Sequence, residues 1–177
     1  MIVTDMLNRY EHEDADQLRE SVRRTVPAIA RAIEAAQERD LMTVFVNDNH
    51  GDWAAGRDEL CEWALDGPHR ELVEPVLPPA RAAFVSKARH SIFYETSLNY
   101  LLRSSGVERI LLTGQVTEQC ILYSALDGYV RHFEIAVASD AVAHIHPDLA
   151  EAALRMMEVN MNAEVAPVCT LVEAVAA

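Results

Sequence analysis

Short apolar segments alternate with longer amphipathic segments along this chain of 177 residues, and this alternation is the feature that most constrains its fold. The short segments have the β-branched composition of strands, and the longest amphipathic segment places apolar residues three and four positions apart, as in a helix with one buried face. Strands that alternate with helices form a parallel sheet covered on both faces. The sequence therefore predicts an α/β fold of three layers, α/β/α, with a mainly parallel, Rossmann-like sheet of about six strands in a single domain, residues 1–177.

The predicted strands are residues 2–4, 42–46, 82–85, 110–112, 135–138 and 165–172. The predicted helices are residues 16–39, 58–65, 96–105, 117–132 and 147–162. Pro27 predicts a kink or a boundary in the first helix, and Pro167 assigns the last strand to an edge of the sheet. The helix 117–132 is apolar around most of its girth, so we expect it to be buried.

Composition excludes several classes of function. The 15 Lys and Arg residues against 28 Asp and Glu residues give a net charge of −13, which disfavours nucleic acids and anionic membrane surfaces as partners. No apolar run is long enough to cross a membrane, and no secretory signal is present, so a cytoplasmic location is expected. The six glycines form neither a dinucleotide-binding fingerprint nor a P-loop.

Three cysteines, Cys61, Cys120 and Cys169, are too few and too unevenly placed for a disulfide framework. Cys120 falls in the first turn of the predicted helix 117–132. Free backbone N–H groups and the helix dipole there favour a thiolate, and the same groups can hold an oxyanion. The alternative for Cys120 is a buried apolar residue on a core helix. We interpret Cys61 and Cys169 as small packed hydrophobic residues, with Cys169 in the predicted strand 165–172.

Two charged residues, Asp5 and Lys87, each follow an apolar strand. Ligands of open parallel sheets bind at the carboxyl ends of the strands, where Asp48, Gly114 and Asp140 are also expected. If Asp5 and Lys87 converge beside a cysteine, the carboxylate can take the thiol proton and the ammonium can stabilise the thiolate. The alternative is structural, because polar residues at strand ends also start loops and cap helices.

Three blocks of sequence resemble a known family: residues 2–8; residues 87–93, which fit the pattern K-x₃-S-x-F; and residues 113–120, followed by Asp127 and Ser139-Asp140-Ala141. Over nearly its whole length the chain is similar to the isochorismatase-like hydrolases, or cysteine hydrolase superfamily. The resemblance implies that Asp5, Lys87 and Cys120 are a catalytic triad. It also implies a non-proline cis peptide bond between Gln115 and Val116, with an oxyanion held by the N–H groups of Val116 and Cys120.

The implied activity is Cys-dependent hydrolysis of a C–N bond in a small amide, ureide or lactam through a thioester, not of peptide bonds. Within the family, likeness slightly favours a streptothricin-type lactam hydrolase over a nicotinamidase-type amidase. Isochorismate vinyl-ether hydrolysis and a catalytically silent binding protein on the same fold are further alternatives. A thiol redox protein is disfavoured because no C-x-x-C motif is present. The resemblance also implies a homo-oligomer, a dimer or a tetramer.

Aromatic and polar residues expected near the same edge of the sheet are candidates for contacting the substrate, with plain packing as the alternative. They are Tyr10, Trp53, Phe93, Tyr94, Gln119 and Tyr123, with His50 as a further candidate. The acidic balance of the chain favours a substrate that is not strongly anionic.

A metal site is the remaining question, because Asp48-Asn49-His50 and His69 match part of the metal-binding pattern of nicotinamidases. Asn49 and Arg70 replace an aromatic residue and a cysteine that usually accompany that pattern. We therefore predict no metal and no cofactor, and interpret these residues as a hydrogen-bonded loop.

Overall fold

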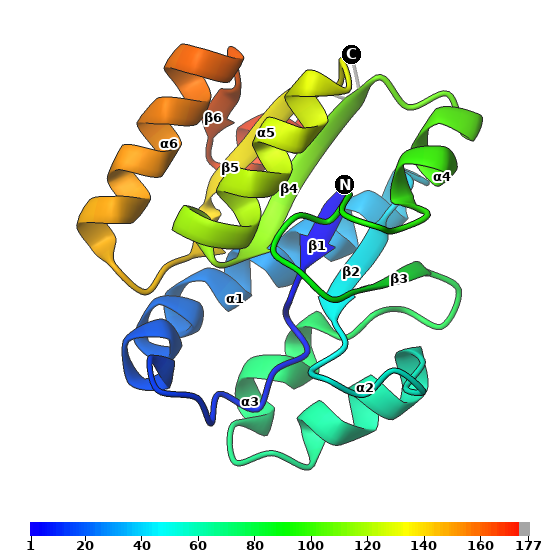
Figure 1. Cartoon of the computed structure of the whole chain (residues 1–177), viewed down its shortest axis with the longest axis vertical. Coiled ribbons are helices and arrows are strands. Elements are labelled where there is room, and N and C mark those ends of the chain that lie inside the picture. The colour runs from blue at the N-terminus through cyan, green and yellow to red at the C-terminus, as the bar shows by residue number, and fades with distance from the viewer. Residues whose placement is uncertain (174–177) are drawn as a thin grey trace.

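Six parallel strands form one sheet in the order β3-β2-β1-β4-β5-β6 (Figure 1), in a computed structural model that describes residues 1–173. The strands are β1 (Ile2–Thr4), β2 (Val44–Asp48), β3 (Ala83–Lys87), β4 (Arg109–Gln115), β5 (Glu134–Ala143) and β6 (Glu164–Ala166). This is the strand order of the Rossmann fold, in which the order reverses between the first and the fourth strand. The predicted fold class is confirmed, whereas the predicted domain, residues 1–177, includes residues 174–177, which lie outside the described residues.

Helices cover both faces of the sheet. They are α1 (Ala15–Glu38), α2 (Arg57–Leu65), α3 (Arg70–Val73), α4 (Leu98–Ser104), α5 (Leu122–Val130), α6 (Pro147–Met161) and α7 (Val168–Glu173). Alternate strand residues point to opposite faces. Val3 and Phe45 pack in one core with α1, α2, α3 and α7, whereas Ile2 and Val44 pack in a second core with α4, α5 and α6.

Two segments continue past the points where the sequence predicts a break. Helix α1 runs through Pro27 without a boundary. Pro27 and Arg23, whose carbonyl loses its helical partner, both lie on the exposed side of α1, so water can satisfy that carbonyl. Strand β5 extends to Ala143, five residues beyond its predicted end, and Asp140 accepts a hydrogen bond from Val168 N–H at 2.7 Å. Asp140 therefore ties β5 to α7.

The end of the chain and helix α5 differ from the prediction. Pro167 ends the edge strand β6 after three residues, and α7 follows, because proline has no N–H for a ladder and suits the start of a helix. Cys169 lies exposed on α7, so its interpretation as a packed residue of a strand is wrong. Helix α5 buries only one face, and Leu126 and Val130 on the other are about half exposed.

The switch point between β1 and β4 is closely packed. Gly114 has φ +108°, and a Cβ there would lie 2.0 Å from Thr4 O. Only glycine meets both conditions without a shift of the backbone. Thr113 Oγ1 also donates to Ile2 O at 2.9 Å, so the two strands that flank the crevice are held in fixed positions.

None of the helices formed by residues 1–173 is both long and apolar enough to span a bilayer.

Candidate active site

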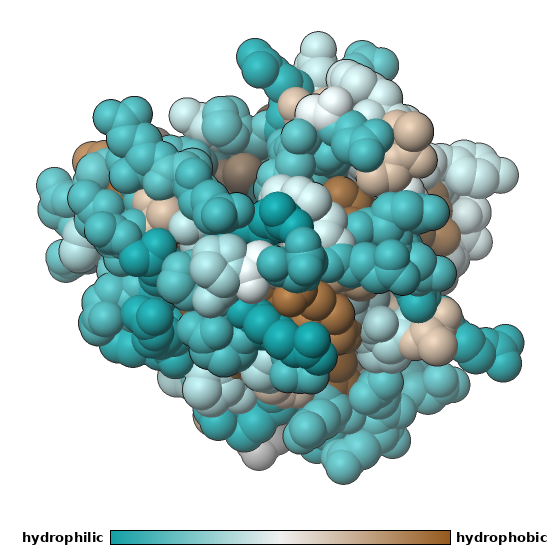
Figure 2. Space-filling model, turned by 90° about the horizontal axis from the view of Figure 1, so that it is seen from below, coloured by the Kyte–Doolittle hydropathy of each residue, from teal (hydrophilic) through white to brown (hydrophobic). Residues whose placement is uncertain are grey.

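A cavity of about 340 Å³ opens at the carboxyl ends of the strands, where the order of the sheet reverses. Figure 2 views the molecule from this end and shows a mostly hydrophilic face with an apolar strip near its middle. The cavity has apolar lining from Leu18, Val116 and Ile145, and charged lining from the ends of β1, β2 and β3. This size and mixed lining are typical of sites for small molecules.

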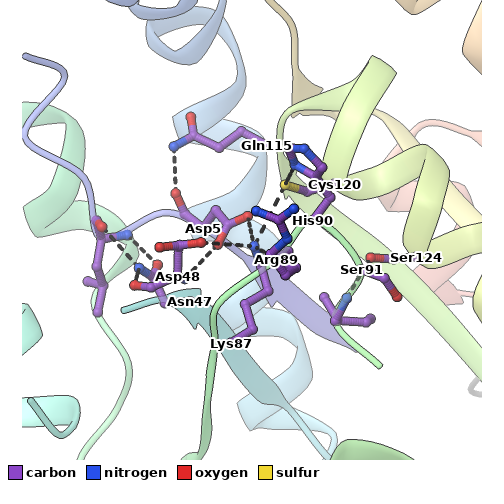
Figure 3. Close-up of polar contacts among 12 residues, drawn as sticks. Asp5, Asn47, Asp48, Lys87, Arg89, His90, Ser91, Gln115, Cys120 and Ser124 are labelled. Carbon is purple, nitrogen blue, oxygen red and sulfur yellow. Dashed lines mark hydrogen bonds and ion pairs between the residues drawn. The ribbon is translucent and has the colours of Figure 1, made fainter. Parts of the chain in front are cut away.

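Lys87, the last residue of β3, lies at the centre of the polar cluster (Figure 3). Its Nζ is 2.9 Å from Asp5 Oδ2 and 3.7 Å from Cys120 Sγ, and it donates to Arg89 O at 3.0 Å. The side chain is 1% exposed. The three donors of the ammonium therefore each have a partner, which a buried charge requires.

Asp5 directly follows β1 in a left-handed conformation, φ +58°. Its N–H donates to Val46 O at 2.9 Å, and its Oδ1 accepts a hydrogen bond from Asp48 N–H at 2.8 Å. Asp48 Oδ2 lies 3.8 Å from Lys87 Nζ on the more exposed side of the cluster. One carboxylate oxygen of Asp5 is thus fixed by the backbone of β2 and the other by Lys87.

Charge and burial set the protonation states of the cluster. Burial by itself would lower the pKa of Lys87, but its interactions with Asp5, Cys120 and Asp48, with Asp5 the strongest, raise it above its usual value. Burial and the Asp5 carboxylate raise the pKa of Cys120 to about 12, although Lys87 acts in the opposite direction. At rest Lys87 is therefore an ammonium and Cys120 a protonated thiol, which differs from the sequence-based expectation that the position of Cys120 favours a thiolate.

The segment between β4 and α5 brings Cys120 into the cavity. The peptide bond between Gln115 and Val116 is cis, at the place that the family resemblance implies. Gln115 Nε2 donates to Asp5 O, which links this segment to β1. Residues 117–121 then form one π-helical turn in which Ile121 N–H reaches Val116 O at 3.1 Å. Gln115, Val116 and Cys120 all line the cavity as a result.

His90 is a member of the site that the sequence analysis did not single out. Its Nδ1 lies 3.7 Å from Cys120 Sγ (Figure 3). Its ring lies 5.5 Å from that of Tyr123. The histidine is exposed and lines the cavity. Its position three residues after Lys87 was the available signal, but only the course of the loop after β3 turns it toward the sulfur.

Two residues predicted to contact the substrate are buried away from the cavity. Tyr10 is 1% exposed, and its ring lies 6.4 Å from that of His69 in an edge-on arrangement. Phe93 stacks on Phe133 with the ring centroids 5.8 Å apart. Neither lines the cavity, because both side chains fill the hydrophobic cores, as the packing alternative expects.

Of the other predicted substrate contacts, some line the cavity and some do not. Gln119 and His50 line it. Tyr123 is half exposed behind His90. Trp53, 83% exposed, and Tyr94, 55% exposed, lie in loops and face solvent outside the lining.

The candidate metal ligands do not form a site. His50 Nε2 is 2.8 Å from Leu7 O, and its ring stacks on Trp63 with centroids 4.4 Å apart. His69 Nδ1 instead lies 3.6 Å from Glu71 Oε1. Within residues 1–173 no three His, Cys, Asp or Glu side chains are grouped in a way that could hold a metal ion. The residues present therefore do not fit the metal that the nicotinamidase pattern implies.

Comparison with known proteins gives consistent matches. A family model described as Isochorismatase domain matches residues 1–171. YaaI of Bacillus subtilis, an uncharacterized isochorismatase family protein, is 29% identical over 165 residues, which cover 93% of this chain and 91% of YaaI. The ureidoacrylate amidohydrolase RutB of Serratia proteamaculans is 29% identical over 185 residues, which cover 86% of this chain and 73% of RutB. The crystal structure of an isochorismatase family protein from Desulfovibrio vulgaris superposes with a TM-score of 0.76 at 24% identity, covering 99% of this chain and 97% of the other.

Proposed function

This chain belongs to the isochorismatase family, and from that premise we propose that it is a cysteine amidohydrolase that cleaves the C–N bond of a small amide or ureide. One observation carries the proposal: Asp5, Lys87 and Cys120 come from three separate segments and meet in a single cavity, with Lys87 Nζ in contact with both partners. A thiol, a carboxylate base and a buried cation are the groups that nucleophilic acyl transfer needs. The amidohydrolase RutB among the relatives supports the same reaction class.

The first step forms the thioester. Asp5 takes the proton of the Cys120 thiol as the sulfur attacks the carbonyl carbon, and the electron pair of the C=O bond moves to oxygen. The N–H groups of Val116 and Cys120 hold this oxyanion, as preorganised donors do in acyl transfer. When the oxyanion collapses, the C–N bond breaks, and Asp5 returns its proton to the departing ammonia or amine.

The second step releases the acid. Asp5, again a carboxylate, takes a proton from a water molecule that attacks the thioester carbonyl. The C–S bond breaks, the sulfur recovers its proton, and the carboxylic acid leaves. Lys87 stays protonated throughout, because its pKa is raised by the anions around it. Its role is to hold Asp5 in place and to stabilise the negative charge that develops on sulfur.

The resting protonation state shapes this mechanism. Because the pKa of Cys120 is raised to about 12, the thiol reacts only when its proton moves to Asp5 during the attack. A nucleophile that is protonated at rest is also protected from adventitious alkylation. Cys61, whose pKa is raised by burial, does not line the cavity and takes no part in the proposed reaction.

The experiment that tests this proposal measures ammonia release from ureidoacrylate, nicotinamide and a panel of short amides. The Cys120→Ala variant should release no ammonia while unfolding like the wild type. The control variant Cys169→Ala removes an exposed cysteine from α7 and should keep full activity. Acyl-enzyme trapped by acid quench should appear by mass spectrometry only when Cys120 is present. Turnover by Cys120→Ala on the wild-type substrate would contradict the proposal.

The same panel separates the alternatives. A streptothricin-type lactam hydrolase opens a cyclic amide without releasing ammonia, which a mass increase of one water in a lactam detects. Hydrolysis of isochorismate by the Cys120→Ala variant would indicate vinyl-ether chemistry that does not need the thiol. A silent binding protein would bind such ligands and convert none. The intact triad disfavours this last alternative, since a protein without turnover has no need to keep a buried thiol, ammonium and carboxylate together.

A further inference from the structure

A second cation, Arg89, lines the cavity beside the triad (Figure 3). In the part of the chain that the structure describes, its guanidinium forms no ion pair and no hydrogen bond with another residue. The cavity lining also contains His12, His50 and His90, and its Lys and Arg side chains are Lys87 and Arg89. Lys87 has no free donor, because Asp5, Cys120 and Arg89 O take all three. Of these two cations, Arg89 is therefore the one that remains available to an anionic ligand.

The backbone of Arg89 is fixed close to the reacting atoms. Its carbonyl accepts a hydrogen bond from Lys87 Nζ at 3.0 Å, and that same Nζ lies 3.7 Å from Cys120 Sγ. The next residue, His90, reaches the sulfur from the same segment, with Nδ1 at 3.7 Å. An arginine side chain that starts from this position reaches a group only a few bonds away from a carbonyl carbon held at the sulfur.

The acidic groups of the cavity do not occupy this cation. Asp5 is bound by Lys87 and by Asp48 N–H, and Asp48 is within 3.8 Å of Lys87 and accepts from His50 N–H. Asp14 also lines the cavity, but within residues 1–173 it forms no ion pair with Arg89. An anionic ligand therefore meets a guanidinium, on the segment after β3, that no carboxylate of the lining already occupies.

We propose that Arg89 is a specificity-determining residue that binds a carboxylate of the substrate, so that the substrate class is a short amide or ureide that also carries a carboxylate. A guanidinium binds a carboxylate through two parallel N–H···O bonds, which fixes orientation as well as charge. This substrate class rests on the proposed amide hydrolysis. The net charge of the chain led us to expect a substrate that is not strongly anionic. The proposed substrate class differs from that expectation, because Arg89, and not the overall acidity of the chain, faces the ligand.

Kinetics on matched substrates test the substrate class. Maleamate is compared with (Z)-but-2-enamide, and 3-ureidopropionate with propylurea, where a methyl group replaces the carboxylate in each neutral compound. In at least one pair, the wild-type kcat/KM should be at least tenfold higher for the compound that carries the carboxylate than for its neutral partner. Arg89→Gln should lose about 10- to 100-fold on that compound and less than twofold on its neutral partner. Arg89→Lys should recover only part of the loss, since it keeps the charge without the fork.

A binding experiment tests the carboxylate site without turnover. Maleate is titrated calorimetrically into Cys120→Ala and into Cys120→Ala/Arg89→Gln. The inference requires that the Kd for maleate be at least tenfold higher for the double variant. Arg155→Gln, which removes an exposed arginine of α6, is the matched control and should change neither measurement. Equal losses on charged and neutral substrates, or maleate binding that ignores Arg89, would overturn the inference. If maleate binds through Arg89 but no compound is hydrolysed, the carboxylate site stands and the proposed amide hydrolysis fails.

Discussion

Removing the ammonium of Lys87 is the most informative single perturbation of this fold. Lys87→Met keeps most of the side-chain volume but leaves the Asp5 carboxylate, 11% exposed, without the cation 2.9 Å away. Breaking a buried ion pair by removing one partner costs about 3–5 kcal/mol, because the remaining charge stays desolvated. We expect the free energy of unfolding to fall by that amount and the hydrolytic activity to disappear.

Two further variants separate the ion pair from simple loss of packing. Asp5→Asn/Lys87→Met removes both charges and should stay inactive. Its loss of unfolding free energy should be smaller than the sum of the losses of the two single variants by at least about 1 kcal/mol. Arg24→Met breaks the exposed pair with Glu20, whose side chains are 61% and 66% exposed, and should cost less than about 1 kcal/mol. Urea unfolding followed by the fluorescence of Trp53 and Trp63 measures all of these values.

The stabilisation by the Lys87 ammonium should also depend on pH in a defined direction. Because the pKa of Lys87 is raised in the folded protein, its contribution is fully present below the unfolded value of 10.5 and is lost as pH rises through the folded value. In a Cys120→Ala background, which removes the titrating thiol, the stability difference between the protein that keeps Lys87 and its Lys87→Met variant should shrink only above about pH 10.5. A difference below about 1 kcal/mol at pH 7, or one that narrows below about pH 9, would refute the argument.

Three other outcomes are expected. Gly114→Ala should lower the free energy of unfolding by about 3 kcal/mol or more, or fail to fold, since its Cβ would lie 2.0 Å from Thr4 O. Gly51→Ala has open space around the new Cβ but φ +85°, so it should cost about 1 kcal/mol. Urea unfolding measures both values. Wild type should lose a few kcal/mol of stability relative to Cys120→Ala as pH rises from 9 to 12, because the unfolded thiol ionises near 9 and the folded one near 12; parallel curves would contradict this. Dialysis against EDTA should leave activity and Tm unchanged, since His50 Nε2 is held by Leu7 O, and activity restored by zinc alone would show that a metal is required.

The sequence was sufficient to predict the layers of the fold, because strand and helix patterns differ in period. Local signals failed where tertiary contacts decide the outcome. Nothing in residues 135–143 indicates that β5 continues past Ala138, since the ladder with β4 and the tie from Asp140 to α7 depend on distant partners. Pro167 correctly indicated an edge strand, whereas Pro27 does not end α1, because it lies on the exposed side of the helix, where water can replace the lost hydrogen bond.

The candidate site divides in the same way. Asp5 and Lys87 could be placed because parallel strands end at one edge of the sheet, which brings residues 82 positions apart into contact. Aromatic residues such as Phe93 and Tyr10 could not be assigned, because a large side chain near a strand end serves a core as readily as a ligand. The contact of His90 with Cys120 depends on the path of a loop, for which the sequence has no periodic signal.

The strand order poses a final question, because this arrangement elsewhere holds a dinucleotide at the same crevice. A phosphate site there needs free backbone N–H groups at the start of the helix and glycines that let the anion approach. Here Gly114 serves the packing of β4 against Thr4, and the following turn places Cys120 toward Asp5. The fold thus determines where a ligand binds, whereas the residues that line the crevice determine which ligand it binds, and here they include the thiol, carboxylate and ammonium that the proposed acyl transfer needs.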